Sequence, residues 1–133
     1  MSLGTWTPTE TTPQPPSRNT LILAASLGLN DVHSFPAHAA PEGLDELQGW
    51  LKQPRSLWQP VLEPLETDIL VALIRFFTLA EHHWAGWEAG DKNPAIWICK
   101  ALKPRGAFPD AELTRWIKAH TDNRFLPYGN PLA

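Results

Sequence analysis

The chain of 133 residues is 43% apolar and 19% charged, which fits one compact domain that buries roughly two thirds of its unfolded surface. This size leaves no room for a second independent core. A single cysteine excludes an internal disulfide framework and favours a reducing compartment, so we expect a cytoplasmic protein.

Neither a membrane span nor a secretion signal is expected. The longest apolar run, Ile69–Ala80, has twelve residues with Arg75 inside it, which is too short to cross a bilayer. Leu21–Leu29 is apolar and residues 37–39 resemble a cleavage site, but a long proline-containing segment with few positive charges precedes the run. The sequence therefore predicts a protein without membrane attachment.

The N-terminal part of the chain is predicted to be a tail followed by one helical domain. Residues 1–19 are rich in Thr, Pro and Ser, which is typical of a disordered tail, so the domain is expected to span residues 20–133. Thr20–Leu29 fits either a short helix or a strand, because its side chains favour helix but Gly28 and its shortness do not. Asn30–Ala40 is expected to be a loop.

A helix is predicted to begin at Pro41, since proline at a first helical position followed by acidic residues is a common helix start. One face of this helix carries three leucines, Trp50 lies at the edge of that face, and Pro54 ends the helix. Arg55–Glu63, which contains Trp58 and Pro60, is expected to be a connector. The three leucines are Leu44, Leu47 and Leu51.

The central core helix is predicted over about Pro64–Trp84. Apolar side chains recur at helical spacing, and so many others flank them that neighbouring elements must cover this helix on more than one side. The predicted core face is Ile69, Leu73, Phe77, Ala80 and Trp84, and the predicted polar side is Asp68, Arg75, Thr78 and His82. Arg75 is expected at the rim of the apolar sector of this helix, where it pairs with Asp68 or another carboxylate. The alternative is that Arg75 binds an anion.

A loop, Ala85–Lys92, carries Trp87 and precedes a helix that is predicted over Pro94–Lys103. Asn93 is expected to cap this helix, and its core stripe is Ala95, Ile98, Cys99 and Leu102. Trp97 and Lys100 fall on the other side, where packing within the segment does not explain them.

A last helix is predicted over 109–120, with Leu113, Trp116, Ile117 and His120 on one face and Arg115 and Lys118 on the other. Residues 121–133 contain two prolines and a glycine and are expected to be extended. The sequence therefore predicts an all-α single small domain of four or five helices, with a disordered N-terminal tail and an extended C-terminal segment.

No catalytic, metal-binding or cofactor-binding residue is predicted. Cys99 lies on the apolar stripe of its helix, where burial raises the pKa of a thiol and makes it inert, so a pairing with His82 or His83 is not favoured. His82 and His83 are adjacent on a helix and point about 100° apart, which disfavours a shared metal ion. Motifs of metalloproteases, serine hydrolases and phosphate loops are absent from the sequence.

The charge distribution suggests where a partner binds. Residues 1–91 carry four Lys/Arg and eleven Asp/Glu, for −7, and residues 92–133 carry seven and three, for +4, which together give −3. The basic part either attracts the acidic part of the same domain or binds a partner. The C-terminal helix pair also resembles a helix-turn-helix in outline, but its connector is long and its polar face offers little base-reading chemistry.

The seven tryptophans sharpen this expectation, because Trp and Arg are enriched in binding hot spots. The predicted function is a non-enzymatic protein-interaction or regulatory domain, with nucleic-acid binding by the C-terminal helix pair as the alternative. The C-terminal segment 124–128 folding over Trp97 would instead make that residue an internal contact. The oligomeric state is not predicted. The hypothetical partner-binding residues are Trp87, Trp97, Lys100, Arg115, Lys118 and Arg124.

Overall fold

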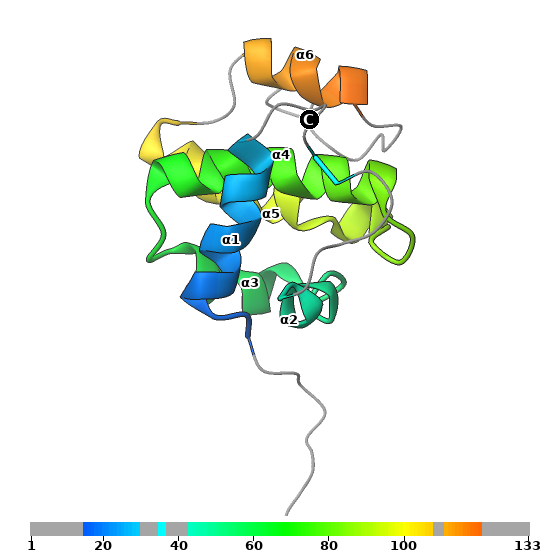
Figure 1. The fold of residues 1–133 in the computed structure, drawn as a ribbon. Coiled ribbons are helices and arrows are strands. Elements are labelled where there is room, and N and C mark those ends of the chain that lie inside the picture. Colours follow the sequence, from blue (N-terminus) through cyan, green and yellow to red (C-terminus); the bar gives the residue numbers. More distant parts are fainter. Residues whose placement is uncertain (1–14, 30–34, 37–42, 108–110, 121–133) are drawn as a thin grey trace, which may run out of the picture.

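The computed structural model describes residues 15–29, 35–36, 43–107 and 111–120, and all regular structure in these ranges is helical. The all-α prediction is confirmed. Most of the predicted tail and the whole predicted C-terminal segment lie outside the described residues. The α-helices, labelled in Figure 1, are α1 (Arg18–Leu29), α2 (Asp45–Gln48), α3 (Arg55–Leu62), α4 (Thr67–His83), α5 (Pro94–Leu102) and α6 (Ala111–His120). The short 3-10 helices η2 (Gly90–Lys92) and η3 (Lys103–Arg105) precede and follow α5.

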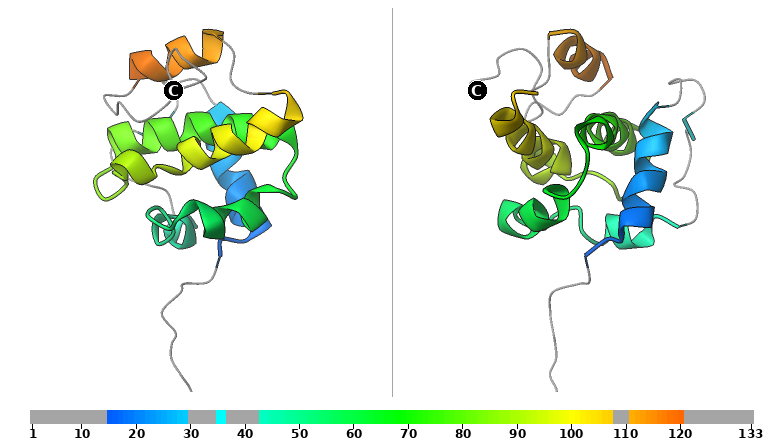
Figure 2. Two further views of the ribbon diagram at one scale, coloured as in Figure 1. Left: turned by 180° about the vertical axis from the view of Figure 1, so that it is seen from behind. Right: turned by 90° about the vertical axis from the view of Figure 1, so that its left-hand side faces the viewer.

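Helix α4 occupies the centre of the domain. Helix α1 crosses one side of it, α5 lies along the other side, and α6 runs across the end of the molecule opposite to α2 and α3 (Figures 1 and 2). The predicted central core helix is confirmed, although it begins at Thr67 and not at Pro64. Among the helices of the described ranges, none is long and apolar enough to cross a membrane.

Nine of the seventeen residues of α4 are buried, on several sides of the helix, as its broad apolar sector predicted. Thr78 was expected on the polar side but is fully buried. Its hydroxyl donates to the carbonyl oxygen of Ile74 at 2.8 Å, which satisfies the polar group inside the helix and allows the burial.

The segment Thr20–Leu29, for which helix and strand were both open, belongs to helix α1. This helix begins at Arg18, two residues before the predicted start of the domain at residue 20. Gly28, the residue that argued against a helix, allows α1 to lie against α4. A Cβ atom at this position would be 2.2 Å from the carbonyl oxygen of Ala72 and 2.8 Å from the amide nitrogen of Phe76. The start of α1 is held by Glu46 of α2, whose carboxylate accepts hydrogen bonds from the amide of Ser17 and the hydroxyl of Thr20.

The predicted helix from Pro41 to Pro54 is wrong in extent, because the described helix there, α2, has only four residues. Gly43 has φ of +96°, a left-handed conformation that cannot continue a right-handed helix from Pro41. Trp50, expected at a core edge, is buried with 2% of its surface exposed. The predicted apolar face itself is confirmed, since Leu44, Leu47 and Leu51 are all buried.

The expected connector over residues 55–63 is instead helix α3, with Pro60 inside it. Proline lacks an amide hydrogen and removes one bond from the helix ladder, which costs roughly 3 kcal/mol. Trp58 and Leu62, spaced four residues apart, are both buried, and burying such side chains contributes roughly 1.5–3 kcal/mol each. Their burial therefore offsets the cost of the proline.

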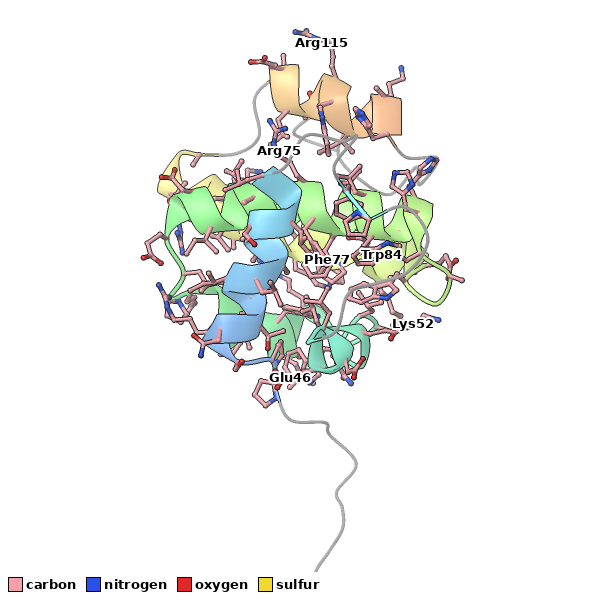
Figure 3. The ribbon with its side chains drawn as sticks, in the orientation of Figure 1. Glu46, Lys52, Arg75, Phe77, Trp84 and Arg115 are labelled. Atoms are coloured by element: carbon pink, nitrogen blue, oxygen red, sulfur yellow. The ribbon has the colours of Figure 1, made fainter. Side chains whose placement is uncertain are left out.

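Most of the described tryptophans belong to this core. The indole of Trp58 donates to the carbonyl oxygen of Trp50 at 3.2 Å, and that of Trp84 donates to the carbonyl oxygen of Pro36 at 2.6 Å. Trp87 packs edge-on against Phe76 and Trp84, with centroid distances of 5.7 and 5.2 Å. Figure 3 shows Trp84 and Phe77 directed from α4 into the interior.

Replacing Gly28 by alanine tests the close contact between α1 and α4. The added methyl group would overlap backbone atoms of α4, so G28A is expected to lower the free energy of unfolding by about 2 kcal/mol or more, measured by urea denaturation. The matched control is G49A. Gly49 has φ of −65°, and a Cβ atom at this position would lie 3.6 Å from the nearest described atoms, the carbonyl oxygens of Asp45 and Glu46, so this change should be neutral or stabilise by up to about 1 kcal/mol. Equal effects of the two substitutions would contradict the packing described.

Candidate functional site

Helix α5 has one side buried in the core and one side turned away from it, and its N-terminal cap and its core stripe fix this orientation. The side chain of Asn93 accepts a hydrogen bond from the amide of Ala95 at 2.8 Å and donates to Glu81 of α4, so the predicted cap is confirmed. The predicted core stripe is also confirmed, since its four residues are buried. This phase leaves Trp97, Lys100 and Ala101 on the side of α5 that faces away from the core stripe.

A pocket lies on that side, where α5 meets α3 and the following turn η3. Helix α3 lies beside α5 in both views of Figure 2. The cavity has a volume of about 280 Å³. Leu62 at its base is buried, Trp97 and Ala101 are half-buried, and the other lining residues are exposed. The lining residues, called the Trp97 pocket below, are Arg55, Gln59, Leu62, Glu63, Trp97, Lys100, Ala101, Pro104 and Arg105.

Helix α3 contributes a polar edge to the Trp97 pocket. Arg55, Gln59 and Glu63 follow one another at intervals of four residues, so they lie in a row on one side of the helix. The amide of Gln59 donates to the carboxylate of Glu63 at 3.3 Å. This edge therefore ends in a cation at Arg55 and in a hydrogen-bonded carboxylate at Glu63.

Arg105 is held in place from the opposite side of the pocket. Its guanidinium donates to the carbonyl oxygens of Leu65 and Glu63 at 2.8 and 3.1 Å, and to the hydroxyl of Thr67 at 3.2 Å. A guanidinium has five N–H donors, so among the described residues these three bonds leave two N–H groups. All three acceptors are neutral, and the positive charge of Arg105 is not cancelled by them.

The lining of the pocket is basic although the chain is acidic. Arg55, Lys100 and Arg105 contribute three positive charges and Glu63 one negative charge, which gives +2 among the described lining residues. The whole chain carries −3. The Trp97 pocket therefore combines an apolar base with a positively charged rim.

Trp97 carries a further feature at this pocket. Its indole nitrogen, Nε1, is buried, and within the described part of the chain it has no hydrogen-bond acceptor. A buried donor without a partner costs about 1–3 kcal/mol. In this respect Trp97 differs from Trp58 and Trp84, whose indoles both donate to backbone carbonyls.

The structure separates the residues that sequence reasoning had grouped as one partner-binding surface. Trp97 and Lys100 lie together at the pocket. Trp87 has only 3% of its surface exposed, so it is removed from the candidate surface because it packs into the aromatic core. Arg124 lies outside the described residues, and so does the segment 124–128 that was expected to cover Trp97.

Arg115 and Lys118 are exposed on α6, which packs on α4 and contributes no lining residue to the Trp97 pocket. Figure 3 shows Arg115 pointing away from the domain. The predicted inner face of α6 is confirmed for Leu113 and Ile117, which are buried. The basic residues of α6 and those of the pocket therefore form two surfaces.

Two predictions about the contact between α4 and α6 need correction. Arg75 was expected to pair with a carboxylate, but its guanidinium carbon lies 4.9 Å from the ring centroid of Trp116, a cation–π contact. Trp116 was assigned to the core but is only half-buried, and its ring is covered by Arg75 and by His120, which stacks on it at 4.4 Å. Figure 3 shows Arg75 directed from α4 toward α6.

The surroundings of Cys99, His82 and His83 bear on their possible roles as a nucleophile or as metal ligands. Cys99 is buried, and burial raises the pKa of its thiol to about 12, so almost no thiolate forms near neutral pH. Burial, followed by the charges of His82 and His120, lowers the pKa of His83 below its ordinary value. Among the described residues, no three His, Cys, Asp or Glu side chains are grouped so that they could hold a metal ion.

Comparison with known protein families, curated proteins and solved structures gave no match for this chain. The residues of the pocket therefore carry the functional argument alone.

Sequence reasoning missed the pocket residues outside α5. The four-residue spacing of Arg55, Gln59 and Glu63 indicates a helix face, but Pro60 led to the expectation of a connector. Arg105 lies in the segment after α5, and only the three-dimensional fold shows that its guanidinium reaches the turn between α3 and α4.

Replacing single tryptophans by phenylalanine tests the assignment of Trp97. W97F removes a buried donor that has no acceptor, so the loss of ring area is offset and the free energy of unfolding should change by less than about 1 kcal/mol. W58F removes a satisfied hydrogen bond from the fully buried core and should cost about 2 kcal/mol or more. Urea denaturation of both variants checks this, and a larger cost for W97F would mean that Trp97 is a core residue.

Proposed function

We propose that this chain is a non-enzymatic binding module that acts in the cytoplasm and uses the Trp97 pocket to bind a segment of another protein. The observation that carries the proposal is the composition of the pocket, an apolar base of Leu62, Trp97 and Ala101 beneath a rim of net charge +2. A buried apolar anchor site surrounded by polar residues is the usual anatomy of a protein interface. The free thiol of Cys99 supports the proposed compartment.

The size of the cavity is compatible with side chains inserted from a protein segment. Sites for small molecules and cofactors typically measure about 300–1,000 Å³. The Trp97 pocket, at about 280 Å³, lies at the small end of that range, a volume that one or two inserted side chains would fill. The polar rim then contacts the rest of the segment.

The alternative proposal is nucleic-acid binding by the exposed face of α6. This face offers Arg115 and Lys118, but Glu112 is also exposed and lies one helical turn before Arg115, so the three residues together carry only +1. Nucleic-acid affinity depends mainly on neutralising phosphates. The Trp97 pocket carries more positive charge and also an apolar base, which favours the protein partner.

Selection of peptides from a random display library on the purified chain tests the proposed function. Recovered peptides should bind the double variant Arg55→Glu, Lys100→Glu at least tenfold more weakly, because this change reverses two of the three positive charges on the pocket rim. The matched control, Arg115→Glu, Lys118→Glu, makes the same change in charge on α6 and should leave the affinity within about twofold. Circular dichroism checks that both variants fold.

Two results would contradict the proposal. One is peptide binding that the α6 variant abolishes and the pocket variant leaves intact. The other is the failure to select any peptide, together with a mobility shift of mixed DNA or RNA at low salt that the α6 variant removes, which would establish the alternative.

A further inference from the structure

We infer that the Trp97 pocket recognises a protein segment in which an acidic side chain stands next to an apolar one, with the apolar group on Trp97 and the carboxylate at Arg105 and Lys100. This inference rests on the proposed function and names the chemistry of the partner.

Arg105 is the group best prepared to receive a carboxylate. Exposed ion pairs contribute little, in part because two long side chains must be fixed in one geometry. Three hydrogen bonds to the turn between α3 and α4 already fix the Arg105 guanidinium, so less entropy remains to be lost on binding. The N–H groups left by these bonds match the two oxygens of a carboxylate.

Lys100 adds a second positive charge beside Arg105. The net positive charge of the rim favours a ligand with a negative charge. Lys100 is exposed, and among the described residues no carboxylate lies within ion-pair distance of it. Glu63 opposes an incoming anion, but its carboxylate accepts a hydrogen bond from Gln59 on the edge formed by α3. With Arg55 the rim keeps two more positive than negative charges, which complements an acidic residue.

The base of the pocket excludes a bare anion as a complete ligand. Leu62 and Ala101 are aliphatic, and an inorganic phosphate or a simple carboxylate would leave this surface and the Trp97 ring without an apolar contact. An aliphatic or aromatic side chain beside the acid covers them and gains roughly 25 cal/mol for each Å² removed from water.

Three synthetic peptides separate the charge requirement from the apolar one. The first is an acetylated and amidated pentapeptide, Ser-Leu-Glu-Leu-Ser, whose only charge is the glutamate side chain. In the second, glutamine replaces glutamate, and in the third, serine replaces both leucines. Nitrogen-15 NMR of the folded chain follows the indole N–H signal of Trp97, which is assigned by its absence in W97F.

The first peptide should shift the Trp97 indole signal in a saturable way, and each of the other two should bind at least fivefold more weakly. Arg105→Gln should remove the preference for glutamate over glutamine. Because Arg105 also holds the turn between α3 and α4, Lys100→Gln provides a second variant that breaks no described hydrogen bond and should reduce the preference at least twofold. Arg115→Gln on α6 should leave the preference unchanged.

The outcomes distinguish this inference from the proposed function. Equal binding of the glutamate and glutamine peptides at Trp97 would overturn the acidic requirement while leaving a peptide-binding pocket. Binding of the serine peptide that is equal to or stronger than that of the first peptide would overturn the apolar requirement in the same way. A Trp97 signal that responds to single-stranded DNA and to none of these peptides would overturn the inference, and peptides selected by display that bind elsewhere would overturn the proposed function.

Discussion

The fold depends on burying the apolar surface of one helix, α4, against its neighbours. Helix α4 is apolar around most of its circumference, and nine of its seventeen residues are buried, so it cannot remain in water and must be packed on several sides. Helices α1, α5 and α6 supply that cover. The contact with α1 is so close that it requires glycine at position 28, and the contact with α6 includes the guanidinium of Arg75 over Trp116.

The candidate site is a consequence of the same packing. The core stripe of α5 packs that helix on α4, which leaves Trp97 and Lys100 on the opposite side of α5. The burial of Trp58 holds α3 in the domain, where it lies beside α5. Arg105 then joins η3 to the turn between α3 and α4 by three hydrogen bonds. The pocket is therefore built mainly on helices that the core holds in place, and such a site can present charge and an apolar surface in a fixed arrangement.

Local patterns in the sequence were sufficient where one segment determined its own structure. The periodicity of α4, the cap at Asn93 and the two faces of α6 were predicted because caps and helical spacing depend on neighbouring residues. Helix α3 was missed because Pro60 argues against a helix, and only the burial of Trp58 and Leu62 in the folded domain compensates for it. The same limit applies to the pocket. Trp97 and Lys100 were predicted from their phase on α5, but Arg55 and Arg105 join them only through tertiary contacts. Trp87 was wrongly placed on the surface because its aromatic partners are distant in the local pattern: Phe76 lies on α4 and Trp84 directly after it.

Native-state hydrogen exchange tests most directly whether the domain is organised around α4. Amide hydrogens in the middle of α4, near Leu73 and Phe77, should exchange only through global unfolding, and their opening free energies should equal the unfolding free energy from urea denaturation. Amides of α6 should exchange through a smaller opening, since α6 packs mainly on one side of α4. Exchange of the α4 amides that is as fast as that of α6, or faster, would contradict the account.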